Sequence, residues 1–230
     1  MIKKVTLNII FGILFIPNLI GQNNQLGNWF IYFGNQKINK SWNFQSDIQL
    51  RNYKFLDQRN QFLIRGGIGY NLQPNNHNIL LGAAYVESNN YDENDIVTNI
   101  SKETRIFEQY IIKKALNDYF FTNRFRFEQR FFPNEFGLRG RYFVSINKPI
   151  GQKDIRNRTF YSSIYNELFI DIKNLTFDRN RFYVGLGYGI TQNVRIESGY
   201  MIQSQKNINR SQLQFILINN FSFKIGRAHV

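Results

Sequence analysis

Cysteine is absent from this chain of 230 residues, and proline (4), histidine (2), tryptophan (2) and methionine (2) are scarce. Without cysteine the chain can form no disulfide, thiolate zinc site, iron–sulfur cluster or cysteine nucleophile. What the sequence does have is aromatic and basic: 17% of residues are Phe, Trp or Tyr, and 29 Lys+Arg outnumber 16 Asp+Glu, for a net charge of +13. This composition excludes a disordered basic tail and predicts one folded domain.

The first residues have the order of a secretory signal peptide. Lys3 and Lys4 precede an apolar run at residues 5–20, and the small residue Gly21 follows. The run is shorter than the roughly 20 residues that a spanning helix needs, which disfavours the alternative of a membrane anchor. We therefore expect residues 1–21 to be removed on export.

The last six residues, 225–230, break the pattern of everything before them. They resemble the translation of a sequencing-adapter oligonucleotide, and we interpret them as an artefact. The predicted domain therefore covers residues 22–224, and a natural C-terminus is expected to be missing.

Between the two ends, runs of about 10 to 14 residues alternate apolar with polar side chains and are separated by short clusters of Asn, Asp, Pro and Gly. In the clearest run, Arg124, Arg126, Glu128 and Arg130 fall on one face of a strand and phenylalanines fall on the other. No helical spacing of apolar residues is sustained. We predict eleven strands, at residues 28–38, 42–55, 61–72, 79–88, 102–115, 119–132, 136–147, 159–172, 179–190, 193–205 and 211–223.

Two architectures satisfy this alternation: a soluble lipocalin-like barrel with its apolar faces inward, and an outer-membrane barrel with them outward. The segments exceed the usual 5 to 6 residues of soluble strands, and aromatic residues gather at their ends, as in membrane barrels. We therefore predict an all-β fold, an antiparallel up-and-down transmembrane β-barrel of about 10–12 strands. Single-chain bacterial barrels have an even strand number, so the odd count predicts a misread segment or a missing closing strand.

Five segments of the sequence are similar to segments of a known protein family. They lie at residues 27–32, 105–109, 124–131, 165–169 and 181–188. Together they resemble the family catalogued as domain of unknown function 2490, over roughly residues 23–223. The resemblance implies an outer-membrane β-barrel of Gram-negative bacteria with no assigned activity. It implies a location and a fold, and it transfers no catalytic residue.

Charged residues on the polar strand faces form the candidate functional site. Their excess of arginine can focus a field that attracts anions, in a porin-like manner. Alternatively, arginine–carboxylate pairs between strands fill and stiffen the lumen. The sequence leaves both interpretations open. The residues expected to face the lumen are Arg124, Arg126, Glu128, Arg130, Arg139, Arg141, Glu167, Asp171, Arg181, Arg195 and Glu197.

An alternative function of a different kind is that of a β-barrel enzyme that acts on lipid or lipopolysaccharide. It requires a base and a nucleophile, usually His with Ser, at one rim. His77 lies among asparagines in an expected turn, and no spacing links it to Ser88 or Ser163. We therefore assign no catalytic residue.

Two further clusters are better explained by structure than by chemistry. The glycines around positions 66–69 and 185–189 lack the following helix of a phosphate-binding loop, and we expect them to make room for bulky neighbours. Asp92, Glu93 and Asp95, in an expected loop at residues 89–101, lack the spacing of a calcium loop. We assign no metal and no cofactor.

The expected partners follow from the expected location. They are outer-membrane lipid, the barrel insertion machinery and lipopolysaccharide, whose phosphates would meet Lys37, Lys40, Lys206 and Arg210. No nucleic acid is expected, because the basic residues are spread through the strands and no binding module is present.

We expect an outer-membrane protein that is structural, or that passes or binds a small solute, with anions favoured. A soluble periplasmic lipocalin-like binding protein is a third alternative.

Overall fold

The computed structural model describes residues 26–73, 77–206 and 208–222. The expected signal peptide and the last six residues lie outside these ranges. Within them, no helix has the length and apolar character needed to cross a membrane. The strands are β1 (Gly27–Lys37), β2 (Trp42–Lys54), β3 (Asp57–Gln73), β4 (His77–Tyr91), β5 (Val97–Leu116), β6 (Tyr119–Phe131), β7 (Phe136–Pro149), β8 (Thr159–Asp171), β9 (Thr176–Gly189), β10 (Val194–Gln205) and β11 (Ile208–Asn219).

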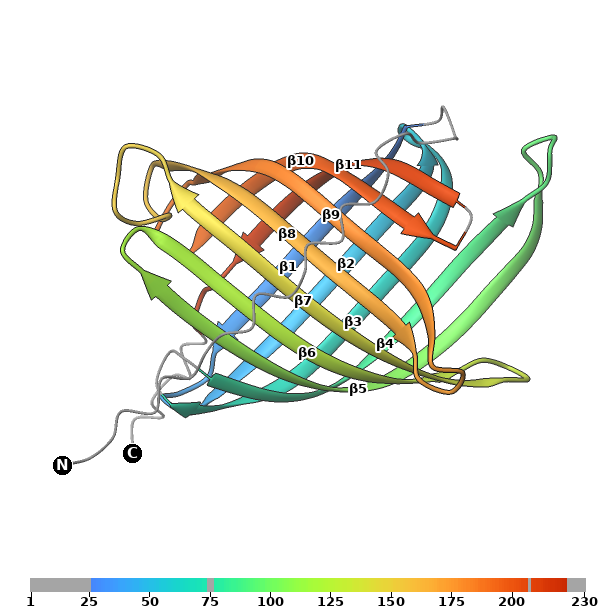
Figure 1. Ribbon diagram of the computed structural model, residues 1–230, viewed down its shortest axis with the longest axis horizontal. Coiled ribbons are helices and arrows are strands. Elements are labelled where there is room, and N and C mark those ends of the chain that lie inside the picture. Colours follow the sequence, from blue (N-terminus) through green and yellow to red (C-terminus); the bar gives the residue numbers. More distant parts are fainter. Residues whose placement is uncertain (1–25, 74–76, 207, 223–230) are drawn as a thin grey trace, which may run out of the picture.

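These eleven strands form one closed barrel, in which each strand pairs with the next along the chain (Figure 1). Neighbours in sequence are antiparallel, whereas β1 and β11 close the barrel in parallel, with Gly27 opposite Gln212 and Gly34 opposite Asn219. The eleven predicted segments are therefore confirmed, and the expectation of a wholly antiparallel barrel is wrong at the closing pair. An odd number of alternating strands gives the first and last strands the same direction, so closure requires neither a misread segment nor another strand.

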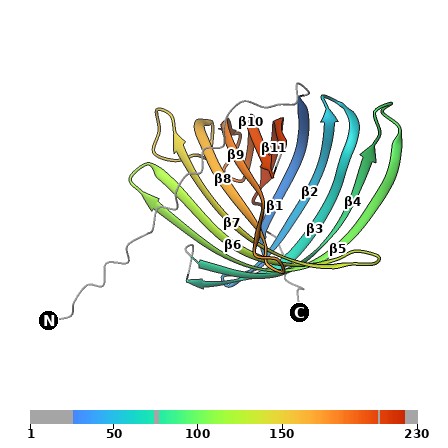
Figure 2. The same ribbon diagram turned by 45° about the vertical axis from the view of Figure 1, so that its right-hand side comes forward.

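The barrel has two ends, and its strands run between them at a tilt (Figure 2). End A holds the start of β1 and the β2–β3, β4–β5, β6–β7, β8–β9 and β10–β11 connections. End B holds the other connections and the last residue of β11. The joined ends of β4 and β5 stand apart from the neighbouring turns at end A (Figure 1).

The longest loop is not the one that the sequence predicted. Strands β4 and β5 continue to Tyr91 and from Val97, so the expected loop at residues 89–101 shortens to 92–96. Asp92 Oδ1 closes it by accepting hydrogen bonds from the backbone N–H groups of Asn94 and Ile96, both at 2.9 Å. In the described part of the chain, the longest connection is residues 150–158, between β7 and β8.

The two strand faces separate as the alternation predicts. On the outer face Ile68 is 53% exposed and Leu186 is 61% exposed, whereas Asp47 and Arg141, on the inner face, are buried. The outward face is therefore apolar and the inward face carries the charge. A lipocalin-like barrel has the opposite orientation.

The interior also contains apolar clusters that the sequence analysis did not anticipate. One joins five buried side chains of β1, β9, β10 and β11, namely Trp29, Ile31, Tyr183, Met201 and Ile216. A smaller one joins Leu80 and Ala84 of β4 to Phe107 of β5. The lumen is therefore apolar at β1 and β9–β11 and, over a smaller area, at β4 and β5, and it is charged along much of the rest.

Two glycines of β9 make room for tyrosine rings inside the barrel, which confirms the role expected of them. A Cβ atom on Gly187 would overlap the ring of Tyr161, and one on Gly185 would overlap the hydroxyl group of Tyr183. Both tyrosines are fully buried. Only a residue without a side chain lets these rings lie flat against the wall.

Replacing Gly187 with alanine should therefore destabilise the barrel. Overpacking of this kind costs about 1–3 kcal/mol, to be measured by urea unfolding of the refolded protein. Gly137→Ala is the matched control, because its new Cβ would lie 3.8 Å from the nearest atom, Arg130 Cβ, and should change the unfolding free energy by less than about 0.5 kcal/mol. Equal effects of the two changes would contradict the packing explanation.

Candidate functional site

A cavity of about 300 Å³ occupies the lumen on the side of end B, and every strand contributes to its lining. Eight basic and three acidic side chains line it, which leaves a surplus of positive charge. The basic residues are Arg51, Arg65, Lys113, Arg124, Arg126, Arg141, Arg181 and Arg195, and the acidic residues are Asp47, Glu167 and Glu197.

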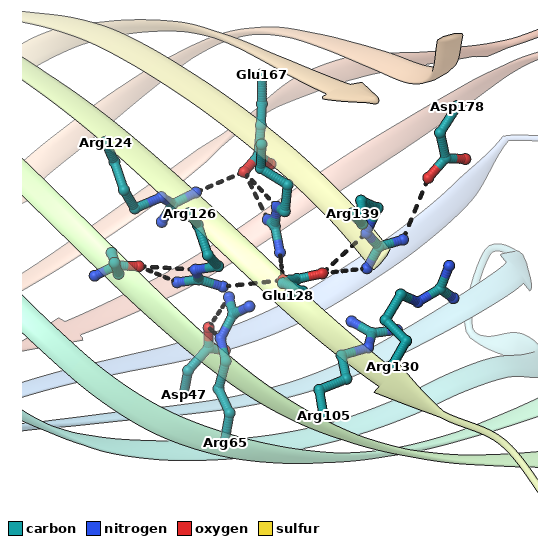
Figure 3. Close-up of polar contacts among 12 residues, drawn as sticks. Asp47, Arg65, Arg105, Arg124, Arg126, Glu128, Arg130, Arg139, Glu167 and Asp178 are labelled. Carbon is teal, nitrogen blue, oxygen red and sulfur yellow. Dashed lines mark hydrogen bonds and ion pairs between the residues drawn. The ribbon is translucent and has the colours of Figure 1, made fainter. Parts of the chain in front are cut away.

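Glu167 of β8 joins three arginines at the wall of this cavity, and Figure 3 shows its contact with one of them, Arg124. Its Oε1 accepts hydrogen bonds from Nη2 of Arg124 and Nη2 of Arg141, both at 2.6 Å. Its Oε2 lies 3.6 Å from Nη1 of Arg181. One carboxylate thus ties together strands β6, β7, β8 and β9.

Glu128 of β6 is the second centre of the network, and its side chain is only 1% exposed. Its Oε2 accepts a hydrogen bond from Nε of Arg139 at 2.9 Å, and its Oε1 accepts one from Nη1 of Arg141 at 2.6 Å. Arg141 therefore bridges the two buried carboxylates, Glu128 and Glu167. Charge-assisted hydrogen bonds of this type are about twice as strong as neutral ones.

Two smaller ion-pair groups flank this centre. Toward end A, Glu103 accepts hydrogen bonds from Nε of Arg105 at 2.6 Å and from Nε of Arg130 at 2.5 Å. On β2 and β3, Asp47 accepts one from Nε of Arg65 at 2.6 Å. In these groups too, arginines pair with carboxylates of the same or a neighbouring strand, and the pattern continues around the lumen.

Asp178 enters the lumen through an irregularity in the sheet. The β8–β9 register shifts between Phe169 and Ile170, and Asp178 is left without a cross-strand partner. Its carboxylate lies 3.3 Å from Nη1 of Arg139 and 3.1 Å from Nε of Arg179. A bulge of this kind re-aims a side chain, and here it adds one acidic group to an arginine-rich layer.

The half of the lumen toward end A is filled by side chains. Apolar residues that are 1% exposed or less pack beside the ion pairs there, namely Leu63, Val86, Phe169 and Met201. Four guanidinium groups lie 4.5–5.8 Å from the ring centroid of Phe169, those of Arg139, Arg141, Arg179 and Arg181. Cation–π contacts of this kind add to the ion pairs. The cavity therefore ends on a packed layer.

Some buried guanidinium groups at the cavity make their side-chain hydrogen bonds to neutral amides and none to a carboxylate. Arg51 donates hydrogen bonds to the neutral amide oxygens of Gln49 and Gln61, and Arg126 donates to that of Gln109. Nη1 of Arg126 makes no hydrogen bond within the described residues, and its nearest carboxylate oxygen, on Glu128, is 3.6 Å away. Buried cations are ordinarily paired, and the carboxylates that line this cavity are fewer than its cations.

The structure brings most of the predicted lumen residues together. Arg124, Arg126, Glu128, Arg139, Arg141, Glu167 and Arg181 form the central network, and Arg130 joins Glu103. Arg195 and Glu197 lie on the cavity wall, where Glu197 accepts a hydrogen bond from the Tyr161 hydroxyl at 3.1 Å.

Asp171 does not belong to this network. It lies at the end of β8, where its carboxylate accepts a hydrogen bond from the backbone N–H of Asn174 at 2.9 Å and so caps the β8–β9 turn. The sequence predicted that Asp171 faces the lumen only from its position in the alternating pattern of the strand.

Other network members were missing from the predicted set. Asp47, Arg65 and Arg105 could have been found, because they fall on the polar face of their own alternating segments. Asp178 could not, because its position depends on the bulge. Trp29, which lies 4.0 Å from the Arg51 guanidinium and 4.8 Å from that of Arg181, was also missed.

The residues considered for enzyme chemistry lie far apart. His77 is the first residue of β4, not part of a turn as expected, and its Nδ1 lies 2.6 Å from the Tyr110 hydroxyl. Ser163 lines the cavity, and Ser88 lies near the other end of β4. The structure brings neither of these serines to His77.

The four cations proposed to meet lipopolysaccharide are divided between the two ends of the barrel. Lys37 and Lys40 flank the β1–β2 turn at end B, whereas Lys206 and Arg210 flank the β10–β11 turn at end A. A single rim therefore holds at most two of them.

A closed barrel with an apolar outer face and a lumen of arginine–carboxylate pairs defines a class of small β-barrel proteins with a polar, largely packed interior. Within that class, this chain belongs to the family described as "Protein of unknown function (DUF2490)", whose sequence pattern matches residues 26–214. The family resemblance expected from the sequence is thus confirmed. None of the curated proteins or solved structures compared with the chain matches it.

Because Glu128 neutralises a buried group of arginines, Glu128→Gln should destabilise the barrel strongly. Removing one partner of a buried ion pair costs about 3–5 kcal/mol, which urea unfolding of the refolded protein would show. Glu87→Gln is the control, because its partner Arg59 is largely exposed and such pairs contribute less than about 1 kcal/mol. A loss at Glu128 no larger than that at Glu87 would contradict the structural role of the network.

Proposed function

We propose that this protein is a bacterial outer-membrane β-barrel that binds a small anion in its lumen. The observation that carries the proposal is the cavity itself, in which eight basic side chains face three acidic ones and a buried guanidinium nitrogen of Arg126 makes no hydrogen bond. Guanidinium groups bind carboxylates and phosphates, and a surplus of them raises the local concentration of anions.

The outer face supports a membrane location. The strands are 11 to 20 residues long, as long as or longer than the 9 to 11 that cross a bilayer. Large apolar side chains on the outer face are exposed on neighbouring strands, among them Ile64, Ile68, Leu81, Ile164, Val184 and Leu186. A continuous apolar belt of this size on a soluble monomer would be an aggregation liability.

Some polar residues at outward positions of the strands, among them the buried Asn180, are paired with each other. Asn166 and Asn180 exchange two side-chain hydrogen bonds at 3.0 Å. The side chain of Gln129 donates to that of Glu108 at 3.3 Å. In a hydrocarbon environment each unpaired polar group would cost several kcal/mol, so mutual pairing favours this location.

The packed half of the lumen favours a binding function over free passage. Ion pairs and fully buried apolar side chains fill the barrel toward end A, and the cavity stops against them. A porin-like channel needs a continuous aqueous path. We therefore propose a binding pocket within the barrel and not an open pore.

The full-length chain, expressed in a Gram-negative host, should be recovered in the outer-membrane fraction. Purified and refolded, it should migrate differently on gels with and without heating, and it should give no stable current steps in a planar lipid bilayer. Release by osmotic shock would instead support a soluble periplasmic protein. Stable current steps would support an open channel and overturn the closed lumen.

Entry of anions into the cavity can be measured with Trp29, which lines it. The only other tryptophan, Trp42, is exposed at end B, so Trp42→Phe leaves Trp29 as the sole reporter. Iodide should quench Trp29 fluorescence more strongly than caesium does, because the surplus of arginine attracts anions and repels cations.

Arg126→Gln should reduce quenching by iodide and leave quenching by neutral acrylamide unchanged. Arg156→Gln, which removes the same charge from the exposed β7–β8 loop, is the matched control and should have no effect. Equal quenching by iodide and caesium, or no difference between the two variants, would overturn anion binding in the lumen.

A further inference from the structure

One side of the cavity is apolar. Ile31 and Phe33 of β1 line it together with Ile216 and Ile218 of β11. In the parallel closing pair, Ile31 lies opposite Ile216 and Phe33 lies opposite Ile218, so the four side chains form a continuous patch. Among the described lining residues, β1 and β11 contribute no charged side chain.

The opposite side of the cavity is basic. Strand β6 is five strands away from both β1 and β11 around the ring of eleven, and it contributes Arg124 and Arg126. Its neighbours β5 and β7 add Lys113 and Arg141. The cavity therefore has an uncharged, apolar wall at β1 and β11. Facing it across the lumen is a wall where these cations lie among the apolar side chains Phe107, Ile111 and Phe143.

The two arginines of β6 retain donors that the protein does not use. Within the described residues, Nη1 of Arg126 and Nε of Arg124 are buried and make no hydrogen bond. Aromatic rings hold both guanidinium groups in place: that of Arg124 lies 4.5 Å from the Phe143 ring centroid, and that of Arg126 lies 4.5 Å from the Phe107 centroid. Such donors are prepared for an acceptor that comes from outside the chain.

We propose that the ligand of this cavity is a small carboxylate on an apolar body, such as an aromatic carboxylic acid. Its carboxylate accepts hydrogen bonds from Arg124 and Arg126, and its apolar body packs against Ile31, Phe33, Ile216 and Ile218. This inference rests on the proposed function and names the class of anion.

The two walls together decide between ligand classes. An inorganic anion would satisfy the arginines and leave the apolar patch in contact with water, whereas a neutral apolar molecule would leave the buried donors unpaired. Only an amphipathic anion uses both walls. The cavity volume of about 300 Å³ lies at the lower end of the range for small-molecule sites, which suits a single-ring compound.

Titration calorimetry of the refolded full-length protein in detergent micelles would test this, with three probes. Benzoate carries both features, acetate lacks the apolar ring, and benzamide lacks the charge. We expect benzoate to bind about tenfold or more tightly than either of the others, since a charge-assisted hydrogen bond and a buried ring each contribute on that order.

Variants assign the two walls separately. Arg126→Gln should weaken benzoate about tenfold and bring it close to benzamide. Ile216→Ala should weaken benzoate severalfold and leave acetate unchanged, because it removes only apolar contact. Arg156→Gln, in the exposed loop, should change neither, and heat-dependent gel migration would show that each variant is folded.

The outcomes distinguish the inference from the function on which it rests. If benzoate and acetate bind equally well, or if Ile216→Ala weakens them alike, anion binding stands and the apolar wall has no role, which overturns the inference. If benzamide binds as tightly as benzoate, the arginines have no role and the inference fails. If no probe binds and iodide does not quench Trp29, the proposed function itself fails.

Discussion

The pairing of arginines with carboxylates inside a closed wall is the interaction on which the rest of this structure depends. The barrel removes these groups from water, and an uncompensated charge there would be costly. Glu128 and Glu167 resolve this by each serving several guanidinium groups, with Arg141 shared between them. Because the partners come from strands β6 to β9, the same contacts that neutralise charge also link these four consecutive strands on their lumen side.

The surplus of arginine over carboxylate divides the lumen into two parts. Where acidic groups are present, at Glu103, Glu128 and Asp178, the side chains pack and fill the barrel toward end A. Toward end B a cavity is left, where basic side chains outnumber the carboxylates and where Arg51 and Arg126 donate hydrogen bonds to neutral amides. Filling of the lumen by ion pairs thus describes the half toward end A, and the anion site that we propose lies in the other half.

The strand number gives the closing pair its unusual geometry and also its chemistry. Eleven strands of alternating direction bring β1 and β11 together in parallel. Residues at the same level along the barrel axis therefore lie opposite each other in this closing pair. The inward positions there are Ile31, Phe33, Ile216 and Ile218, so the seam is apolar and lies opposite the arginines of β6. The polarity of the cavity therefore follows from how the barrel closes.

The sequence by itself determined the eleven strands, the side of each that is apolar, and most of the lumen charges, because a side-chain period of two is a local property of the chain. It also indicated the family. Only the tertiary structure decided the parallel closure, the bulge that turns Asp178 inward, and the contact by which Asp171 caps the β8–β9 turn, because these depend on pairing between strands. It also decided which arginines find a carboxylate and which do not, since partners such as Arg124 and Glu167 are 43 residues apart and meet only across the closed barrel.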